Sequence, residues 1–325
     1  MKLVVLDGYT LNPGDISWDA LPSGVECQVF DRTTPDELYE RAKDADILLT
    51  NKTPLTSGVL KSLPLLKYIG VLATGYNVVD VEQAAAQKIV VTNVPAYGTN
   101  SVAQLVFALI LELCNHVGQH SEAVRSGAWS RSPDWCFWQT PLIELHGKTL
   151  GIVGYGRIGQ SVGRLAPAFG MDVIVTSARQ LTQPTGAERW VTVDDVFAQS
   201  DIVSLHCPLN VSTEGMVNAE RLERMKREAF LINTSRGGLI IEEDLAHALN
   251  AERIAGAALD VLSTEPPDES NPLLRAKHCI VTPHLAWATR EARGRLMSTA
   301  LQNVSAWLSG KPENVVNGSS LLERN

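Results

Sequence analysis

Several features that would mark other classes of protein are missing from this sequence. Its five cysteines are scattered among 325 residues without a CxxC pair, which argues against a disulfide framework and against a zinc site. No apolar run spans a membrane, since the most apolar stretch, 102–114, is interrupted by Gln104 and Glu112. The segment before Asp7 is too short for the core of a signal peptide. We therefore expect a cytoplasmic protein with reduced thiols and no metal.

Basic residues are also in short supply. Lys and Arg number 28 against 36 Asp and Glu, so the net charge at pH 7 is −8. A negative field repels nucleic acid and anionic membranes, and neither is expected as a partner. An anionic small molecule must then be held by local positive groups. With 45% hydrophobic residues, no low-complexity tract and no repeat, the composition is that of a globular protein, and the length favours two domains.

Short apolar runs alternate with helical segments along the chain, which predicts parallel strand pairing. The fold class expected is α/β, with two doubly wound Rossmann-like domains and an active-site cleft between them. Residues 1–100 and 290–325 are predicted to form a substrate-binding domain, and residues 101–289 a dinucleotide-binding domain. Strands are expected at 2–7, 25–30, 46–50, 68–72, 89–92, 149–153, 172–176, 202–205, 230–233, 256–259 and 279–282, and helices at 34–43, 79–87, 101–114, 157–169 and 289–309.

A phosphate-binding turn follows the strand at 149–153 and reads Gly154-Tyr155-Gly156-Arg157-Ile158-Gly159. Gly154 permits the tight turn, Gly156 lets the backbone approach a pyrophosphate, and Gly159 lets helix and strand pack closely. A GxGxxG pattern alone is also compatible with an ordinary turn. In this strand–turn–helix context it predicts that the chain binds a dinucleotide.

The residue that usually selects the ribose is absent from its expected place. An acid normally closes the second strand and binds the ribose 2′-hydroxyl, whereas here Ser177 stands there, with Arg179 two residues later. A serine and a guanidinium can bind a 2′-phosphate that a carboxylate would repel. The cofactor is therefore NAD or NADP, and the alternative that Arg179 simply points to solvent stays open.

Three reactive side chains follow three later strands. Arg236 stands beside glycines, where its planar fork can engage a carboxylate and a carbonyl oxygen together. His284 suits the protonation of an alkoxide left by hydride transfer, and Glu265 beside it would stabilise the imidazolium form. Taken alone, Arg236 has a surface salt bridge as its alternative role, and a histidine after a strand is more often structural. Because all three stand at the ends of strands, we predict a single catalytic site.

At these residues the chain resembles the D-isomer-specific 2-hydroxyacid dehydrogenases. The likeness runs nearly end to end, through the glycine turn, 233–237, 259–261 with 265–266, and 282–284, although Gln104 replaces the family's usual glutamate. It implies that Arg236 orients the substrate, that His284 is the acid/base also contacting the substrate, and that Glu265 is its partner. It also implies cofactor contacts at His206, Pro208, Thr234, Ser235 and Asp260, and a substrate-carboxylate loop at Ala73, Thr74 and Gly75, whose backbone amides suit an anion.

The resemblance leaves the substrate open. Formate dehydrogenases carry glutamine at Glu265, and phosphoglycerate dehydrogenases often extend into a regulatory domain beyond a point such as Asn325. The loop at 73–77 has no neighbouring lysine or arginine for a phosphate. The connector at 134–139 is similar to that of glycerate dehydrogenases, also called hydroxypyruvate reductases. Hydroxypyruvate is therefore the expected substrate, with glyoxylate as a second, and Trp135 and Trp138 either cap its pocket or fill an interface.

Two rival functions remain at this level. One is a cofactor-sensing binding module, like the transcriptional co-repressors that share this fold, and the other is a dehydrogenase of a bulkier 2-keto acid. The family resemblance also implies a homodimer formed through the cofactor domain. The expected partners are thus a small 2-keto or 2-hydroxy acid, a nicotinamide cofactor and a second copy of the chain.

Overall fold

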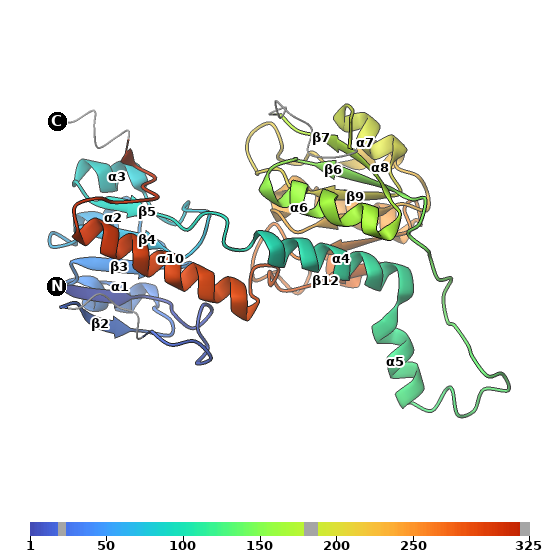
Figure 1. Cartoon of the computed structure of the whole chain (residues 1–325), viewed down its shortest axis with the longest axis horizontal. Coiled ribbons are helices and arrows are strands. Elements are labelled where there is room, and N and C mark those ends of the chain that lie inside the picture. Colours follow the sequence, from blue (N-terminus) through green and yellow to red (C-terminus); the bar gives the residue numbers. More distant parts are fainter. Residues whose placement is uncertain (19–23, 179–187, 319–325) are drawn as a thin grey trace. The chain divides into compact units, whose positions relative to one another are not determined.

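The computed structural model describes residues 1–18, 24–178 and 188–318. The chain divides into two compact units (Figure 1): unit 1 comprises Met1–Gly98 and the segment from Trp287 onward, and unit 2 comprises Thr99–Ala286. The sequence had placed both boundaries a few residues later. Each unit is built on a parallel sheet with helices on both faces, which confirms the two-domain α/β fold class. The cleft expected between the domains stays a prediction.

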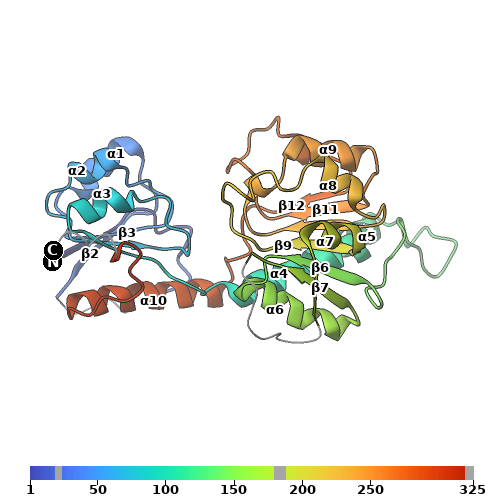
Figure 2. The same ribbon diagram turned by 90° about the horizontal axis from the view of Figure 1, so that it is seen from above.

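Unit 1 contains a sheet of five strands within its described residues, in the order β2-β1-β3-β4-β5. Alternate residues of each strand face opposite sides, so Val4 and Leu48 pack under α1 to α3, whereas Leu3 and Ile47 pack under α10. Figure 2 shows these helices on the two sides of the sheet. The elements are β1 (Lys2–Val5), β2 (Glu26–Val29), α1 (Pro35–Ala42), β3 (Ile47–Thr50), α2 (Ser57–Lys61), β4 (Tyr68–Val71), α3 (Val81–Ala86), β5 (Val90–Thr92) and α10 (Arg290–Leu308).

Unit 2 contains a sheet of seven strands within its described residues, in the order β12-β11-β10-β9-β6-β7-β8. Helices α7, α8 and α9 cover one face, and α4 and α6 cover the other (Figure 2). Its strands are β6 (Thr149–Val153), β7 (Asp172–Thr176), β8 (Arg189–Trp190), β9 (Ile202–Leu205), β10 (Phe230–Asn233), β11 (Gly256–Leu259) and β12 (Cys279–Val281). Its helices are α4 (Thr99–Asn115), α5 (Val117–Arg125), α6 (Arg157–Leu165), α7 (Val193–Gln199), α8 (Ala219–Arg224) and α9 (Glu242–Asn250), with single-turn helices η1 (Ala166–Phe169), η2 (Gly237–Leu239) and η3 (Pro272–Arg275).

No bounds were predicted for helices α7, α8 and α9, and the structure differs from the expected elements of unit 2 in three further places. Strand β8 adds a seventh strand at the sheet edge, and helix α5 precedes the connector where no helix was expected. The helix expected at 157–169 ends at Leu165 and continues as the tighter turn η1, which contains Pro167. Proline cannot donate the backbone hydrogen bond that a continuing α-helix needs, so the helix stops there.

Helix α4 is the apolar helix that the sequence singled out, and it is a core element of unit 2. Its residues Val106, Phe107 and Ile110 are buried against β6, β10 and α6. A bend of 56° separates it from α5 at His116, whose backbone is left-handed with φ 47°. Among the described helices none is by itself long and apolar enough to cross a membrane, although α4 and α5 reach that length and composition as a bent pair.

The five cysteines are free thiols. Burial raises the pKa of Cys114 to about 11 and that of Cys279 to about 12. Burial likewise raises the pKa of Cys27 and Cys207. A thiol with a raised pKa stays protonated at neutral pH and reacts slowly, because the thiolate is the nucleophile. The thiols of these four cysteines are therefore weak nucleophiles at neutral pH.

The strands of unit 2 end together at one edge of the sheet. Val153 of β6 pairs with Thr176 of β7 and with Leu205 of β9, and Leu205 pairs with Asn233 of β10. The row continues from Asn233 to Leu259 of β11 and then to Val281 of β12. Parallel strands in register end at the same edge of the sheet, so the loops that follow these six strands lie in one region of the surface. Doubly wound sheets bind their ligands in this region.

Candidate active site

The glycine turn occupies the loop between β6 and α6, at the point where the strand order of the sheet reverses. Gly154 has φ +96°, and a Cβ atom there would lie 2.4 Å from the backbone nitrogen of Cys207. A Cβ on Gly159 would lie 2.3 Å from the carbonyl oxygen of Gly154, so strand and helix approach closely at this point. The first-turn amides of α6, from Arg157 to Gly159, have no carbonyl four residues back within the helix and remain available to an anion.

The first two glycines of this turn should respond differently to alanine. We expect Gly154→Ala to destabilise the fold by about 2 kcal/mol or more, because it combines left-handed strain with a backbone clash. A Cβ on Gly156 meets no atom within 4 Å. Gly156→Ala should therefore keep the wild-type melting temperature and instead weaken dinucleotide binding about tenfold or more, because the methyl group occupies the place of the pyrophosphate. Thermal melts without cofactor and a fluorescence titration with NADPH measure the two effects, and equal melting temperatures for both variants would contradict this assignment.

Other predicted cofactor residues lie around the turn. Ser177 follows β7 and is partly exposed, whereas Arg179 lies outside the described residues. The hydroxyl of Thr234, which follows β10, is buried and has no hydrogen-bond partner within the described residues. A buried hydroxyl normally has a partner, so this one suits a bound polar group. The open space beside the Gly156 backbone and the unpartnered hydroxyl of Thr234 thus fit a nicotinamide dinucleotide.

His206 and Pro208 follow β9 beside the glycine turn. The Nε2 atom of His206 is 2.9 Å from the hydroxyl of Ser204. Although part of its surface is exposed, burial lowers the pKa of His206 to about 4, and the ring is neutral at physiological pH. Pro208 is exposed and accepts a hydrogen bond through its carbonyl oxygen from Thr213. A neutral ring and an exposed proline leave this loop uncharged beside the phosphate turn.

Arg236 is held by the backbone around it. Asn233 accepts a hydrogen bond from the Ser235 amide at 3.0 Å and donates one to the Arg236 carbonyl at 2.9 Å. The Ser235 hydroxyl donates to the Cys207 carbonyl at 2.7 Å, which links this turn to the loop after β9. The guanidinium of Arg236 is exposed, and in the described structure its partner is the Ser235 carbonyl, at 2.7 Å. The turn is therefore fixed while most of the guanidinium donors remain available to a ligand.

Glu265 and His284 form a hydrogen-bonded pair. Glu265 Oε2 lies 2.6 Å from His284 Nδ1, and the second oxygen, Oε1, accepts from the Leu262 amide at 3.2 Å. About a third of each side chain is exposed, with 30% for His284 and 35% for Glu265. With Nδ1 engaged by a carboxylate, Nε2 is the nitrogen available for proton transfer to a ligand. This is the pairing that the sequence predicted.

Asp260 is buried and organises the segment that carries His284. One of its oxygens accepts from the Thr282 hydroxyl at 2.6 Å and from the Leu285 amide at 2.9 Å, and the other accepts from the Ala286 amide at 2.8 Å. Its carbonyl oxygen accepts from the His284 amide at 2.8 Å. His284 has a left-handed backbone with φ 51°, which is uncommon for histidine and is held by these bonds. Asp260 thus positions the histidine, a role that the sequence had not predicted for it.

The predicted carboxylate-binding loop belongs to unit 1 and follows β4. Thr74 donates through its hydroxyl to the Val94 carbonyl, at 2.9 Å, and Asn93 donates to the Thr74 carbonyl, at 2.7 Å. In the part of the chain that the structure describes, the amides of Thr74 and Gly75 donate no hydrogen bond, whereas the Ala73 carbonyl accepts one from Val94. Two unused amides on a braced loop are suited to a carboxylate.

The structure therefore brings Arg236, Glu265 and His284 to one edge of unit 2, together with the glycine turn, Thr234 and Asp260. It does not bring Trp135 and Trp138 to that edge of the sheet, since their connector extends away from the body of unit 2 with the two side chains 87% and 65% exposed (Figure 1). Sequence reasoning missed Ser204 beside His206, and it missed Glu242, a buried carboxylate that contacts the Glu265 loop. Neither has a local signal in the sequence.

Comparison with known proteins identifies the family of this chain. The family profile described as D-isomer specific 2-hydroxyacid dehydrogenase, NAD binding domain, matches residues 107–286. A hydroxypyruvate reductase from Blautia hydrogenotrophica is 51% identical over 98% of this chain and 100% of its own length. This chain belongs to the D-isomer-specific 2-hydroxyacid dehydrogenase family.

A second relative and a solved structure are also similar to this chain. A glycerate dehydrogenase from Methylorubrum extorquens is 42% identical over 87% of this chain and 89% of its own length. The crystal structure of TT0316 protein from Thermus thermophilus superposes with a TM-score of 0.85 and 33% identity, covering 97% of this chain and 100% of that one. The resemblance predicted from the sequence is confirmed, and the chain is an oxidoreductase with a nicotinamide dinucleotide-binding domain.

Proposed function

We propose that this dehydrogenase reduces hydroxypyruvate to D-glycerate, with glyoxylate as a second substrate. The observation that carries the proposal is the 2.6 Å contact between Glu265 and His284 beside Arg236 on one sheet edge. Relatives named for hydroxypyruvate reduction and glycerate oxidation support the choice of acid. Glyoxylate carries the same 2-oxo acid group without the hydroxymethyl group, so a site for hydroxypyruvate also accommodates it.

In the proposed reaction a reduced nicotinamide, held on the glycine turn, would supply a hydride, and thus two electrons, to C2 of the keto acid. The electron pair of the C=O bond moves to oxygen, which takes a proton from Nε2 of His284. Glu265 stabilises the imidazolium form before that transfer, and water reprotonates the ring afterwards. Arg236 contacts the carbonyl oxygen and the carboxylate, so that negative charge developing on oxygen is met by a fixed cation.

The substrate carboxylate is proposed to bind the amides of Thr74 and Gly75 in the loop at 73–77. Because the protein carries net negative charge, such local donors are needed to hold an anion. Ala73 anchors the loop through its carbonyl bond with the Val94 amide. The cofactor is proposed to lie on the glycine turn, with contacts from His206, Pro208, Thr234 and Ser235 along it.

The cofactor preference is proposed to be NADPH, with NADH also accepted. The support is that Ser177 follows β7 at the position where an acid usually stands. A serine would not repel a 2′-phosphate, and it would not bind both ribose hydroxyls as a carboxylate does. We expect Ser177→Asp to raise the ratio of kcat/KM for NADH over NADPH by about tenfold or more, since the new carboxylate repels phosphate. Ser177→Asn is the matched control of equal size without charge, and a ratio that moves equally in both variants would contradict the charge argument.

A panel of initial rates tests the proposed substrate. Hydroxypyruvate, glyoxylate, pyruvate and 3-phosphohydroxypyruvate are each offered with NADH and with NADPH. The highest kcat/KM is expected for hydroxypyruvate, followed by glyoxylate. A maximum for a bulkier or phosphorylated acid would replace the proposed substrate, and binding of NADPH without oxidation by any acid would instead support a cofactor-sensing module.

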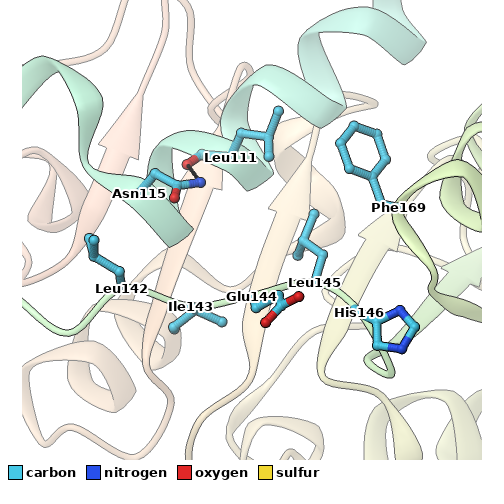
Figure 3. Close-up of a pocket in the computed structure, with 8 residues that line it drawn as sticks. All are labelled: Leu111, Asn115, Leu142, Ile143, Glu144, Leu145, His146 and Phe169. Carbon is cyan, nitrogen blue, oxygen red and sulfur yellow. Dashed lines mark hydrogen bonds between the residues drawn. The ribbon is translucent and has the colours of Figure 1, made fainter.

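A homodimer formed through unit 2 is the proposed assembly. Helix α5 buries Ala123 alone, and Val117 on it is 62% exposed, although a helix of nine residues is marginal without packing partners. Figure 3 shows a pocket beside the end of α4, where the side chains of Leu142 and Phe169 are exposed. A second copy would cover these apolar side chains. Sedimentation at twice the 35.3 kDa chain mass is expected, and a monomer at micromolar concentration would exclude this assembly.

A further inference from the structure

The loop that carries Glu265 is closed at both ends by one buried carboxylate. Residues 263–270, here called the Glu265 loop, are exposed throughout. Glu242, the first residue of α9, is 9% exposed; its Oε1 accepts from the Ser263 amide at 2.7 Å, and its Oε2 accepts from the Asn271 side-chain amide at 2.8 Å. One side chain thus connects the first residue of the loop to the residue that follows the last.

This carboxylate is held by donors and not by a cation. Each oxygen of Glu242 receives an N–H group, and within the described residues no ion pair involves it. Burying a charge without such donors would be strongly unfavourable, so the burial of the Glu242 carboxylate requires both hydrogen bonds. The start of α9 adds a favourable field, because a helix N-terminus stabilises an anion. The side chain of Glu242 is therefore held in place by its hydrogen bonds with Ser263 and Asn271.

Those partners in turn fix the backbone on both sides of Glu265. Asn271 also accepts from the Leu273 amide at 3.0 Å, so its side chain joins Glu242 to the start of η3. At the other end, Leu262 lies directly against the turn of Arg236, since a Cβ on Gly237 would lie 1.9 Å from the Leu262 carbonyl carbon. Leu262 also donates its amide to Glu265. The backbone just before the loop, at Leu262, is thus packed against the Arg236 turn. Glu242 connects that end of the loop to Asn271 at its other end.

From these contacts we propose that Glu242 is a positioning residue, which holds the Glu265 loop so that Glu265 stays within hydrogen-bond distance of His284 Nδ1. Within the described residues Glu242 makes no hydrogen bond or ion pair to Arg236, Glu265 or His284. This inference rests on the proposed catalytic role of Glu265 and His284. A charge-assisted bond of 2.6 Å tolerates little displacement, and a misplacement of about 1 Å at a reacting group commonly costs about a hundredfold in rate.

The test is a double-mutant cycle between Glu242 and Glu265. In the wild-type background, Glu242→Ala is expected to lower kcat for hydroxypyruvate by about 30-fold or more, with the NADPH dissociation constant changed less than about twofold. In a Glu265→Ala background the same substitution should change kcat by less than about twofold, because the group it positions is gone. Glu243→Ala removes an exposed acid from the same helical turn and is the matched control, with activity expected near wild type.

Glu242→Gln separates positioning from loss of folding. The glutamine oxygen still accepts from the Ser263 amide, while its NH2 group no longer accepts from Asn271, so an intermediate loss of kcat at an unchanged melting temperature is expected. Equal losses from Glu242→Ala in both backgrounds, or wild-type kcat in both Glu242 variants, would overturn the positioning role. Wild-type kcat in Glu265→Ala and His284→Ala would instead overturn the proposed catalytic pair itself, and these two failures are thus distinguishable.

Discussion

Replacing His284 with alanine is expected to lower kcat for hydroxypyruvate by about 10²–10⁴, the range that general acid–base groups contribute. The keto oxygen must gain a proton as hydride arrives, and without the imidazole that proton comes from water. The dissociation constant of NADPH should stay unchanged, because the glycine turn and Thr234 lie on other strands. Stopped-flow absorbance of the reduced nicotinamide and a fluorescence titration measure the two quantities.

Backbone strain at position 284 is a competing explanation that a second variant removes. His284 has φ 51°, a conformation that asparagine adopts more readily than alanine does. His284→Asn should therefore fold like the wild type and lose the same activity as the alanine variant. His247→Ala, at an exposed position on α9, serves as the control for loss of a histidine. Recovery of turnover in His284→Asn would show that the imidazole does not transfer the proton.

Arg236→Lys is expected to lower kcat/KM by about 10²–10³, although the charge is retained. The planar fork of arginine makes two parallel hydrogen bonds, which the single ammonium group of lysine cannot reproduce. The main chain at this position is fixed by Asn233 and Ser235, so the substitution removes the fork without moving the turn. Both a higher KM and a lower kcat should result, because the guanidinium is proposed to contact the carboxylate and the developing oxyanion.

The matched control for Arg236 is Arg275→Lys, an exposed arginine on η3, for which wild-type kinetics are expected. If kcat/KM of Arg236→Lys stays within about threefold of wild type, the charge alone suffices and the bidentate role is wrong. A fall in NADPH affinity in the same variant would instead place Arg236 on the cofactor.

Much of the site could be predicted from the sequence because of how parallel sheets are built. Glu265 and His284 are 19 residues apart, and Arg236 is 29 residues before Glu265, yet each follows a strand of the same sheet. Parallel strands end at a common edge, so recognising the strands was enough to bring these residues together. The glycine turn was recognisable because its backbone conformation needs particular residue types.

The parts that could not be predicted depend on contacts made by distant segments. Glu242, Glu243 and Asp244 are three successive acids at the start of α9, and nothing local distinguishes the buried one. Glu242 is buried because Ser263 and Asn271 supply donors from more than twenty residues away. Helix α5 was missed for a related reason: it packs few of its own residues, so its sequence shows no apolar face.

The in-register strands of unit 2 also have a consequence for handling the protein. The alignment of the strands gathers the reactive groups at one edge of the sheet. The opposite edge carries turns such as 251–253 and 276–278, where Glu252 and Lys277 form an exposed ion pair of 2.8 Å. A fluorescent label, an affinity tag or a covalent tether placed in these turns stands a full strand length from the reacting atoms. We expect such a conjugate to keep its turnover, which would allow the molecule to be immobilised through the edge opposite its reactive groups.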